Sequence, residues 1–475
     1  MYDDTIVAIA TPPGEGGIGI VRLSGPAALA IGHAIFHPLR SGPFRPYRLR
    51  YGHVRDPADG RLIDEALLTF MRGPRSFTAE DLVEISGHGG PLPLQAILGL
   101  ALAQGARLAR PGEFTMRAFL NGRLDLTQAE ATLDVIRAQT STGLALAQAQ
   151  LGGWLAREVR AVRAGLMEAL AYVTVAVDFP EDEVEPQDVG PALRSGLASV
   201  ERLLRSADQG QIYRQGARAA LVGRPNVGKS SLLNALLRAD RAIVTPIAGT
   251  TRDTLEETAN LAGVPVVLID TAGITESADP VERLGVERSR LALAGADLAL
   301  LVLDAQQDLT EDDRLIAALT VEKPTVIVWN KAEGRRRTVD GGRWMVDDDP
   351  DHLLTPNPQP LTPITHPRLG ASVATAAREG LGIDELAQAI ATALLGGAVP
   401  SGGEAQLVSN PRHRDALARA VEHLRAAVAT AGGGVPTDLL AGDLTTALNA
   451  LGEIIGESVG DDLLDLIFSR FCIGK

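Results

Sequence analysis

The stretch Gly223–Ser230, with the sequence GRPNVGKS, decides the fold of the domain around it. Apolar runs at Ala219–Val222 before it and Leu232–Leu237 after it predict a strand, a loop and a helix, in that order. In such a loop the glycines let backbone N–H groups turn toward phosphates, Lys229 adds a charge at the outer phosphates, and Ser230 can supply a hydroxyl to Mg²⁺. A ligand-free glycine turn would leave Lys229 and Ser230 without a role, so we predict a phosphate loop in an α/β domain.

Length, charge and cysteine usage limit the classes of protein that fit. The chain has 475 residues, a net charge of −14 and one cysteine, Cys472. The length predicts about three domains, and a single cysteine excludes an intrachain disulfide and a cysteine-rich zinc site. The acidic start Met1–Asp4 is unlike a secretory signal and no apolar run reaches membrane-spanning length, so we expect a cytoplasmic protein with no membrane span.

A local basic patch stands against the acidic average. Arginines recur through Arg40–Arg61, interleaved with Phe44, Tyr47 and Tyr51. The net charge argues against a surface that binds nucleic acid everywhere, but this cluster could face phosphates. It could equally be a solvated loop face, and the sequence leaves both interpretations open.

Changes in composition along the chain predict a multidomain protein. Residues 1–119 mix short β-type runs with turns and predict an α+β domain. Residues 120–214 and 401–475 have helical patterning, and residues 215–400 contain the phosphate loop. Two helical blocks that flank an inserted domain most simply pack together as one α-helical middle domain.

Several short segments carry more local predictions. Thr127–Glu130 resembles a capping box at the start of a helix. Gly334–Pro367 is rich in proline and charge and is predicted to be an extended or disordered insertion, with no function assigned. Arg22, Glu84 and His88 lie at predicted strand ends and are candidates for lining a pocket, although a lone histidine beside glycines is more often a turn residue.

Two further segments supply the phosphate side of a GTPase. A predicted strand ends in Asp270-Thr271-Ala272-Gly273, where the Asp270 carboxylate can hold Mg²⁺ through water and the Gly273 N–H can meet the γ-phosphate. Gly249–Asp253 lies where a switch loop would be. We expect Thr251 to contact the metal, with Thr250 as the alternative.

The base side of the site follows later in the chain. Asn330–Glu333 follows the predicted strand Thr325–Trp329 and resembles the guanine-reading NKxD motif of GTPases. Glu333 stands where those proteins have aspartate, which keeps the charge but changes the reach. Thr375–Ala377 resembles the short backbone motif that contacts the base. GTP is therefore the predicted nucleotide.

The residue that orients the attacking water differs from that of Ras-like enzymes. There a glutamine directly follows the DxxG motif, whereas this chain has Ile274. Another group must place the water, and a carboxylate such as Glu276, Glu282 or Glu287 with a cation has the chemistry. Arg252 could serve as an arginine finger or be a surface residue of the switch.

Taken together, these motifs resemble the MnmE (TrmE) family of tRNA-modifying GTPases, over nearly the whole chain. The segments outside the nucleotide site that carry the resemblance are Asp4–Ala8, Thr11–Gly14, Arg22–Gly25, Arg110–Thr115, Arg117–Leu126 and Phe471–Lys475. The resemblance implies an N-terminal domain that dimerises and binds 5-formyl- or methylene-tetrahydrofolate, a helical middle domain completed by the C-terminal helices, and an inserted Ras-like P-loop G domain.

The resemblance also assigns folate-binding residues. Arg22, Arg123 and Lys475 fall where the family places basic groups near the folate, and Glu84 is the expected partner of the pterin N–H groups. A glutamate tail needs cations and a pterin needs a carboxylate, so these residue types suit the ligand. Cys472 matches the family's terminal cysteine and could be a reactive thiol or an inert side chain.

A K⁺ ion replaces the arginine finger in this family. Asn226 matches its ligand, and backbone carbonyls within Ile247–Thr251 would complete the shell when two G domains meet face to face. Glu282 matches the carboxylate that orients the water, which answers the question raised by Ile274.

The predicted function is a K⁺-dependent GTPase activated by G-domain dimerisation. As a homodimer, and in a heterotetramer with the FAD-containing MnmG (GidA), it would add an aminomethyl or carboxymethylaminomethyl group to C5 of the wobble uridine of tRNA, using a folate one-carbon unit. The alternative is a ribosome-assembly-type GTPase switch that binds RNA without modifying it.

The predicted catalytic residues are Glu282, Thr251 and Gly273. The predicted metal ligands are Ser230, Thr251, Asp270, Asn226, Ile247, Gly249 and Thr250. The predicted nucleotide contacts are Gly223, Asn226, Val227, Gly228, Lys229, Ser230, Ser231, Asp270, Thr271, Ala272, Gly273, Asn330, Lys331, Glu333, Thr375 and Ala376.

Overall fold

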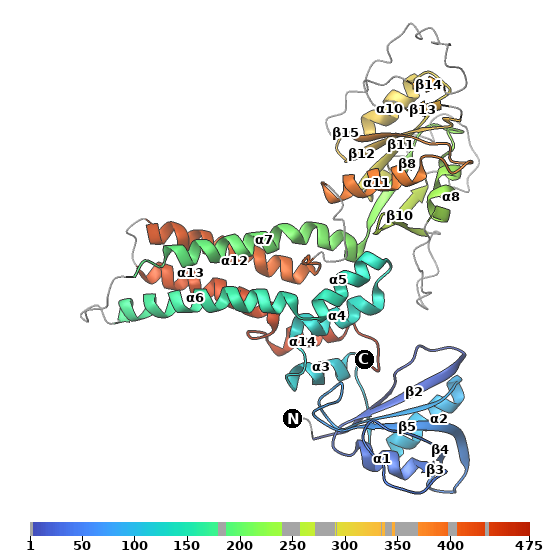
Figure 1. Cartoon of the computed structure of the whole chain (residues 1–475), viewed down its shortest axis with the longest axis vertical. Helices are drawn as coiled ribbons and strands as arrows, with labels where there is room; N and C mark the ends of the chain where they lie inside the picture. Colours follow the sequence, from blue (N-terminus) through green and yellow to red (C-terminus); the bar gives the residue numbers. More distant parts are fainter. Residues whose placement is uncertain are drawn as a thin grey trace. The chain divides into compact units, whose positions relative to one another are not determined.

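The structure, a computed structural model, describes residues 3–178, 187–239, 257–270, 290, 292–333, 335–337, 344–346, 369–397, 406–432 and 437–475. Contacts divide the chain into two compact units, which are coloured along the sequence in Figure 1. The first unit contains Met1–Leu133, Gln150–Leu197 and Arg419–Lys475, and the second contains Asp134–Ala149 and Ala198–Ala418. This division does not test the four boundaries expected from the sequence, which stay predictions.

The first unit contains a seven-stranded sheet with the order β3-β4-β5-β6-β2-β1-β7. Its strands are β1 (Ile6–Ile9), β2 (Gly16–Ser24), β3 (Phe36–Pro38), β4 (Leu49–Arg55), β5 (Leu62–Met71), β6 (Leu82–Gly89) and β7 (Arg107–Leu108). Neighbouring strands are antiparallel except β1 and β7. Burial alternates along β5, which is the expected pattern for a sheet with one face on a core. The α+β prediction is confirmed.

Two helices, α1 (Ala28–Ile35) and α2 (Pro91–Ala103), supply the core of this sheet. Ile31 of α1 and Ile97 of α2 pack with inward-facing strand residues such as Leu68 and Ile85. The polar side chains of β2 and β6 therefore remain on the other face. There Arg22 and Glu84 lie directly opposite each other in the strand register.

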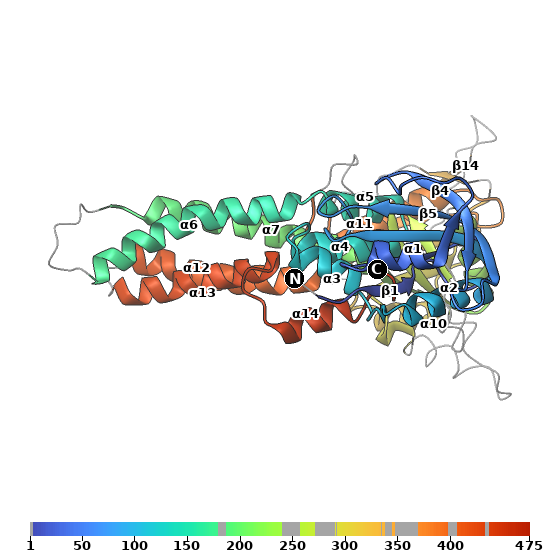
Figure 2. The ribbon, with the colours of Figure 1, turned by 90° about the horizontal axis from the view of Figure 1, so that it is seen from below.

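Helices from before and after the nucleotide-binding segment pack together. The helices that follow the first sheet are α3 (Glu113–Leu120), α4 (Leu126–Arg137), α5 (Ser141–Leu151), α6 (Trp154–Asp178) and α7 (Gly190–Gln215), and the C-terminal ones are α12 (Pro411–Gly432), α13 (Thr437–Ile455) and α14 (Asp461–Phe468). Helix α13 packs along α6, as Figure 1 and Figure 2 both show. This pairing joins segments that the inserted domain separates in sequence.

The capping box predicted at Thr127–Glu130 is wrong. Helix α4 begins at Leu126, so the residue in the capping position is Asp125. The Gln128 N–H donates to Asp125 Oδ1 at 3.0 Å, and the Asp125 N–H donates to Gln128 Oε1 at 3.0 Å. The Asp125 carboxylate accepts the Gln128 N–H as readily as a threonine hydroxyl would, so the helix starts two residues earlier.

The second unit contains a six-stranded sheet with the order β15-β12-β11-β8-β10-β9. Its strands are β8 (Ala217–Val222), β9 (Glu257–Leu261), β10 (Val264–Asp270), β11 (Leu298–Asp304), β12 (Thr325–Asn330) and β15 (Leu369–Ala374). Only the β9–β10 pair is antiparallel. One face packs on α8 (Lys229–Ala239) and α11 (Ile383–Leu395), and the other packs on α10 (Glu311–Leu319). This is a Ras-like P-loop fold, as predicted.

Part of the predicted insertion has regular structure. Within 334–367, β13 (Arg335–Arg337) and β14 (Trp344–Val346) form an antiparallel pair. These two short strands are compatible with the extended form of the expected extended or disordered insertion, and the rest of the insertion lies outside the described residues. Along the described ranges, no helix is both long and apolar enough to cross a membrane.

Candidate functional site

The phosphate loop joins β8 to α8 and depends on its two glycines. Gly223 has a φ of +154°, and a Cβ placed on it would lie 2.3 Å from the Val302 carbonyl oxygen of β11. Gly228 has a φ of +97°, and a Cβ there would lie 2.2 Å from Nδ2 of Asn330. The loop therefore lies against the ends of the neighbouring strands, where a side chain has no space.

Lys229, the first residue of α8, folds back over this loop. Its Nζ donates to the carbonyl oxygens of Gly223 at 2.8 Å and Arg224 at 2.9 Å, and the residue is 9% exposed. Burial lowers the pKa of Lys229, and the nearby Asp270 carboxylate opposes this shift. The ammonium group is thus held inside the curve of the loop, where the outer phosphates of a nucleotide would lie.

The two predicted Mg²⁺ ligands from separate segments meet at the start of α8. The Ser230 hydroxyl donates to Oδ2 of Asp270, at the end of β10, over 2.9 Å. A hydroxyl and a carboxylate oxygen at this separation form the kind of all-oxygen ligand pair that Mg²⁺ takes beside nucleotide phosphates. The residues present therefore fit the metal.

Asn330 connects the phosphate loop to the predicted base-contacting segment. Its Nδ2 donates to the Val227 carbonyl at 3.0 Å, and its Oδ1 accepts from the Thr375 hydroxyl and the Ala377 N–H, each at 3.2 Å. The side chain is only 2% exposed. One amide thus fixes the relative positions of three segments that the sequence places far apart.

Lys331 and Glu333 are held by the turn after β11. Lys331 Nζ lies 2.8 Å from Oδ2 of Asp304, and Gln306 Nε2 donates to Oε2 of Glu333 at 3.0 Å. Burial alone would raise the pKa of Asp304, but the bonds from Lys331 and from the Gln306 N–H outweigh it and hold that pKa below its usual value. Asp304 and Gln306 were given no role by the sequence.

A cavity of 570 Å³ lies between α8 and the segment that follows β15. It is lined by Ser231 and Asn234 of α8 and by Ala377, Arg378 and Asp384 on the opposite side, among others. Its size is in the range of small-ligand sites. One predicted nucleotide contact, Ser231, therefore lines this cavity, and Ala377 of the predicted base-contacting segment lies on its opposite side.

The remaining predicted switch and catalytic positions lie outside the described residues. They are Ile247, Gly249, Thr250, Thr251, Arg252, Thr271, Ala272, Gly273, Ile274, Glu276, Glu282 and Glu287. Their roles stay predictions.

A second cluster gathers the predicted folate residues on the first sheet. Arg22 pairs with Glu84 through Nε at 2.8 Å and Nη2 at 2.7 Å, and its Nη1 donates to the Gly474 carbonyl at 3.2 Å. Lys475 is close enough to Arg22 and Glu84 to sense both charges. Burial, then Arg22, lowers the pKa of Lys475, against the opposing effect of Glu84 and Cys472.

Two arginines of this cluster lie over the ring of Phe77. The guanidinium of Arg22 is 5.8 Å from its ring centroid, and that of Arg123 is 5.1 Å away. Arg123 Nη1 also donates to the Phe77 carbonyl at 3.0 Å. Arg22 and Arg123 therefore meet at one aromatic ring, and Glu84 and Lys475 lie near Arg22.

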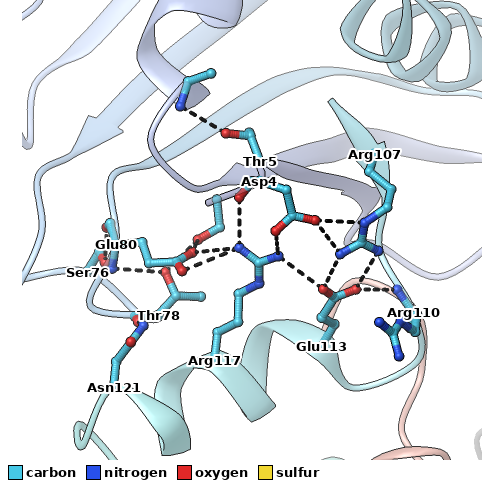
Figure 3. A network of polar contacts seen from close by, with 12 residues as sticks. Asp4, Thr5, Ser76, Thr78, Glu80, Arg107, Arg110, Glu113, Arg117 and Asn121 are labelled. Carbon is cyan, nitrogen blue, oxygen red and sulfur yellow. Dashed lines mark hydrogen bonds and ion pairs between the residues drawn. The ribbon is translucent and has the colours of Figure 1, made fainter. Parts of the chain in front are cut away.

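Figure 3 shows a buried charge network that includes Glu80, a residue of the loop that also carries Phe77. Arg117 of α3 is fully buried; its Nη2 lies 2.6 Å from Asp4 Oδ1 and 3.1 Å from Glu113 Oε1, and its Nη1 is 3.3 Å from Glu80. Arg107 Nη2 contacts the same two carboxylates, Asp4 at 2.7 Å and Glu113 at 2.6 Å. Although burial opposes it, bonding to the two arginines holds the pKa of both carboxyls below their usual values.

The network reaches the loop through two further bonds. Ser24 of β2 donates to Glu80 at 2.7 Å, and Asn121 Nδ2 donates to the Thr78 carbonyl at 2.7 Å. Thr78 follows Phe77 directly and Glu80 lies three residues after it, so both bonds hold the loop that carries the ring. No sequence pattern predicts these contacts, because their partners come from distant segments of the chain.

Two weaker sequence predictions have different outcomes. His88 is a strand residue of β6, not a turn residue, and its Nδ1 lies 2.6 Å from Oδ1 of Asp64. The hydrogen bond with Asp64 raises the pKa of His88. In the arginine cluster, Arg55 donates to the Gly60 carbonyl at 2.9 Å and Arg61 lies 3.8 Å from Asp56, which favours a solvated loop role for these two arginines.

Two comparisons with known proteins cover the chain from end to end. A family model described as the MnmE helical domain matches residues 126–472, and one described as the GTP-binding protein TrmE N-terminus matches residues 5–123. The tRNA modification GTPase MnmE of Chloroflexus aurantiacus is 65% identical over 473 residues, with 100% of both chains covered. The chain belongs to the MnmE family.

Other members of the family show the same full-length match. The MnmE proteins of Roseiflexus castenholzii and Moorella thermoacetica are 62% identical over 475 residues and 47% identical over 481 residues, again with 100% of both chains covered. Among solved structures, the G domain of the T. maritima FeoB iron transporter is 23% identical, covers 37% of this chain and 98% of its own, and has a TM-score of 0.24. A TM-score this low supports no conclusion about fold or function. Family membership and the G domain make the chain a GTP hydrolase.

Proposed function

We propose that this GTPase, with an FAD-containing MnmG partner, adds an aminomethyl or carboxymethylaminomethyl group to C5 of the wobble uridine of tRNA. The coarser function, a tRNA-modifying GTPase, follows from the family. The observation that supports the finer proposal is the cluster in which Arg22 and Arg123 lie against Phe77, while Glu84 pairs with Arg22 and Lys475 lies near both. A ribosome-assembly switch that only binds RNA has no use for such a site.

The convergent residues suit a reduced folate. The carboxylate of Glu84 can accept from pterin N–H groups, the Phe77 ring offers an apolar face, and the three cations can pair with a glutamate tail. A bound folate would supply the one-carbon unit. In this proposal Arg22 and Glu84 bind and orient the ligand, because their mutual pairing fixes both side chains.

Nucleotide binding and hydrolysis are assigned to the second unit. Lys229 and the loop N–H groups would bind the phosphates, Ser230 and Asp270 would hold Mg²⁺, and Asn330 and Glu333 would read guanine. Thr251, Gly273 and Glu282 are proposed to close on the γ-phosphate and to orient the water. The working assembly is proposed to be a cytoplasmic homodimer joined to MnmG in a heterotetramer.

The proposed tRNA modification is tested most directly by measuring the modified base in tRNA. In cells that lack their own member of the family, this chain should restore the modified wobble uridine, as measured by mass spectrometry of tRNA nucleosides. The variant Glu84→Ala should not restore it, because the pterin-binding carboxylate is gone, and purified Glu84→Ala should bind reduced folate more weakly than the wild-type chain. Glu65→Ala removes an exposed carboxylate from the neighbouring strand and should behave as wild type.

Two outcomes would count against the proposal. If the wild-type chain restores growth or GTPase activity but not the modified base, the RNA-binding switch becomes the better description. If Glu84→Ala binds folate normally, the cluster around Phe77 is not the folate site.

Asn226 is proposed as the K⁺ ligand, with the Ile247, Gly249 and Thr250 carbonyls. It is exposed at the tip of the loop with a φ of +66°. K⁺ would supply positive charge beside the phosphates in place of an arginine finger.

We expect hydrolysis of GTP by the wild-type chain to be at least about tenfold faster in K⁺ than in Na⁺. Asn226→Gly removes the side chain at a backbone angle that glycine adopts freely, and should abolish this preference while GDP binding persists. Equal wild-type rates in the two salts would exclude the mechanism.

A further inference from the structure

Glu333 raises a physical question about guanine recognition. The residue at this position must accept hydrogen bonds from N1–H and the 2-amino group of guanine at the same time. Glutamate has one more rotatable bond than aspartate, so its carboxylate is less well fixed and more entropy is lost when it binds. A group that fixes the longer side chain before the nucleotide arrives would reduce this cost.

Gln306 is in contact with that carboxylate. Its Nε2 donates to Oε2 of Glu333 at 3.0 Å and to the Lys331 carbonyl at 3.1 Å. Both partners are acceptors, so the amide can face them only with its nitrogen, and the assignment of N and O is decided by chemistry. The two N–H bonds of one amide join the side chain of Glu333 to the backbone of the motif that carries it.

Gln306 is itself held in place. Its N–H donates to Oδ1 of Asp304 at 3.0 Å, while Oδ2 of the same carboxylate accepts from Lys331 Nζ at 2.8 Å. Asp304, Gln306 and Lys331 thus form a closed ring of hydrogen bonds, and Gln306 bonds Glu333 to this ring. The ring exists because β11 and β12 are parallel neighbours in which Asp304 pairs with Asn330, so the turn after one strand lies beside the motif after the other.

We propose that Gln306 is a specificity-determining positioning residue that holds the Glu333 carboxylate ready to read guanine. The ligand class is a guanine nucleotide, distinguished by the 2-amino group from hypoxanthine nucleotides such as IDP. This inference rests on the proposed guanine-reading role of Glu333. Oε2 is the atom that Gln306 fixes, and fixing it sets the direction of the whole carboxylate.

The test compares GDP and IDP binding to the full chain by isothermal titration calorimetry. IDP lacks the 2-amino group, so the ratio of the two dissociation constants measures how well the carboxylate is placed. Gln306→Ala should lower the preference for GDP about fivefold to tenfold, which lies within the net contribution of one ordinary hydrogen bond. Gln306→Glu keeps the size but sets two carboxylates together, and should lower the preference at least as much. Gln307→Ala, at the next position of the same turn, is the matched control and should leave the ratio unchanged.

Variants of Glu333 separate this inference from the role on which it rests. Glu333→Ala should itself lower the preference for GDP, and adding Gln306→Ala to it should have no further effect. In a Glu333→Asp background the shorter side chain does not reach Gln306, so Gln306→Ala should again matter little. If Glu333→Ala lowers the ratio but Gln306→Ala does not, or if Gln306→Ala weakens GDP and IDP equally, Gln306 has no specificity role. If Glu333→Ala leaves the ratio unchanged, the guanine-reading role of Glu333 fails as well.

Discussion

Replacing Lys229 by alanine is expected to lower GTP hydrolysis at least about 100-fold, because it removes two charge-assisted hydrogen bonds worth roughly 1.5 kcal/mol or more each. In the free protein these bonds go to the carbonyl oxygens of Gly223 and Arg224. The same buried ammonium is the charge that would meet the outer phosphates. Its loss leaves Arg224, which is paired with Asp313 at 2.8 Å, as the remaining cation of the loop, so nucleotide affinity should fall together with turnover.

The measurement is steady-state phosphate release together with titration by GDP. Lys323→Ala is a matched control, since Lys323 precedes β12 and its Nζ donates to the Ala296 carbonyl at 2.5 Å. Asn330 stands at the other end of the same strand, so Lys323 lies at the edge of the sheet away from the phosphate loop. Near-wild-type turnover in Lys229→Ala would show that another cation binds the phosphates.

The nucleotide fold could be predicted because its signals are local. The segment Gly223–Ser230 encodes a loop conformation that only glycine permits at two positions, and the strands around it are continuous apolar runs. In a parallel sheet the carboxyl ends of such strands meet at one edge. The meeting of Ser230 with Asp270, and of Asn330 with Thr375, follows from that rule.

The same rule could have placed Gln306 at the nucleotide site. It follows β11 by two residues, so the same edge rule places it beside the motif after β12. Its sequence neighbours, however, show no motif, and a glutamine in a polar turn is ordinarily solvated. The departure at Glu333 was the available signal, because a longer carboxylate invites a search for a partner.

The supports beneath the folate cluster could not be predicted in this way. Arg117 lies in a segment that helped to identify the family, but its partners Asp4, Glu80 and Glu113 come from a strand start, a loop and a neighbouring helical turn. No periodicity links such positions. The capping box at Asp125 was missed for a simpler reason, since aspartate and threonine both cap helices and the sequence offered both within three residues.

Arg117→Ala is expected to destabilise the first sheet by about 3–5 kcal/mol, the cost of breaking a buried charge network by removing one member. The Arg117 side chain is fully buried. Its removal would leave the side chains of Glu113 and Glu80, which are 1% and 9% exposed, without this cation. Hydrogen exchange measured by mass spectrometry should show the loss in β1, β7 and α3, while β8 and β12 serve as an internal reference in the other unit. Arg117→Lys, which keeps the charge but not the planar fork, should give a smaller loss.

The matched control is Arg110→Ala. It removes an exposed arginine three residues before Glu113 and should change stability by no more than about 0.5 kcal/mol.

The charge on the partners of Arg117 gives this prediction a second, independent test. Asp4 and Glu113 have folded-state pKa values below their usual values of 3.8 and 4.5, so their stabilising contribution is complete at neutral pH and is lost as the pH falls through the lowered values. The difference between wild type and Arg117→Ala should therefore shrink in acid, because protonated carboxyls no longer need the guanidinium. A difference that stays constant from neutral to acidic pH would mean that Arg117 acts through packing of its buried stem, and that the ion pairs in Figure 3 contribute little.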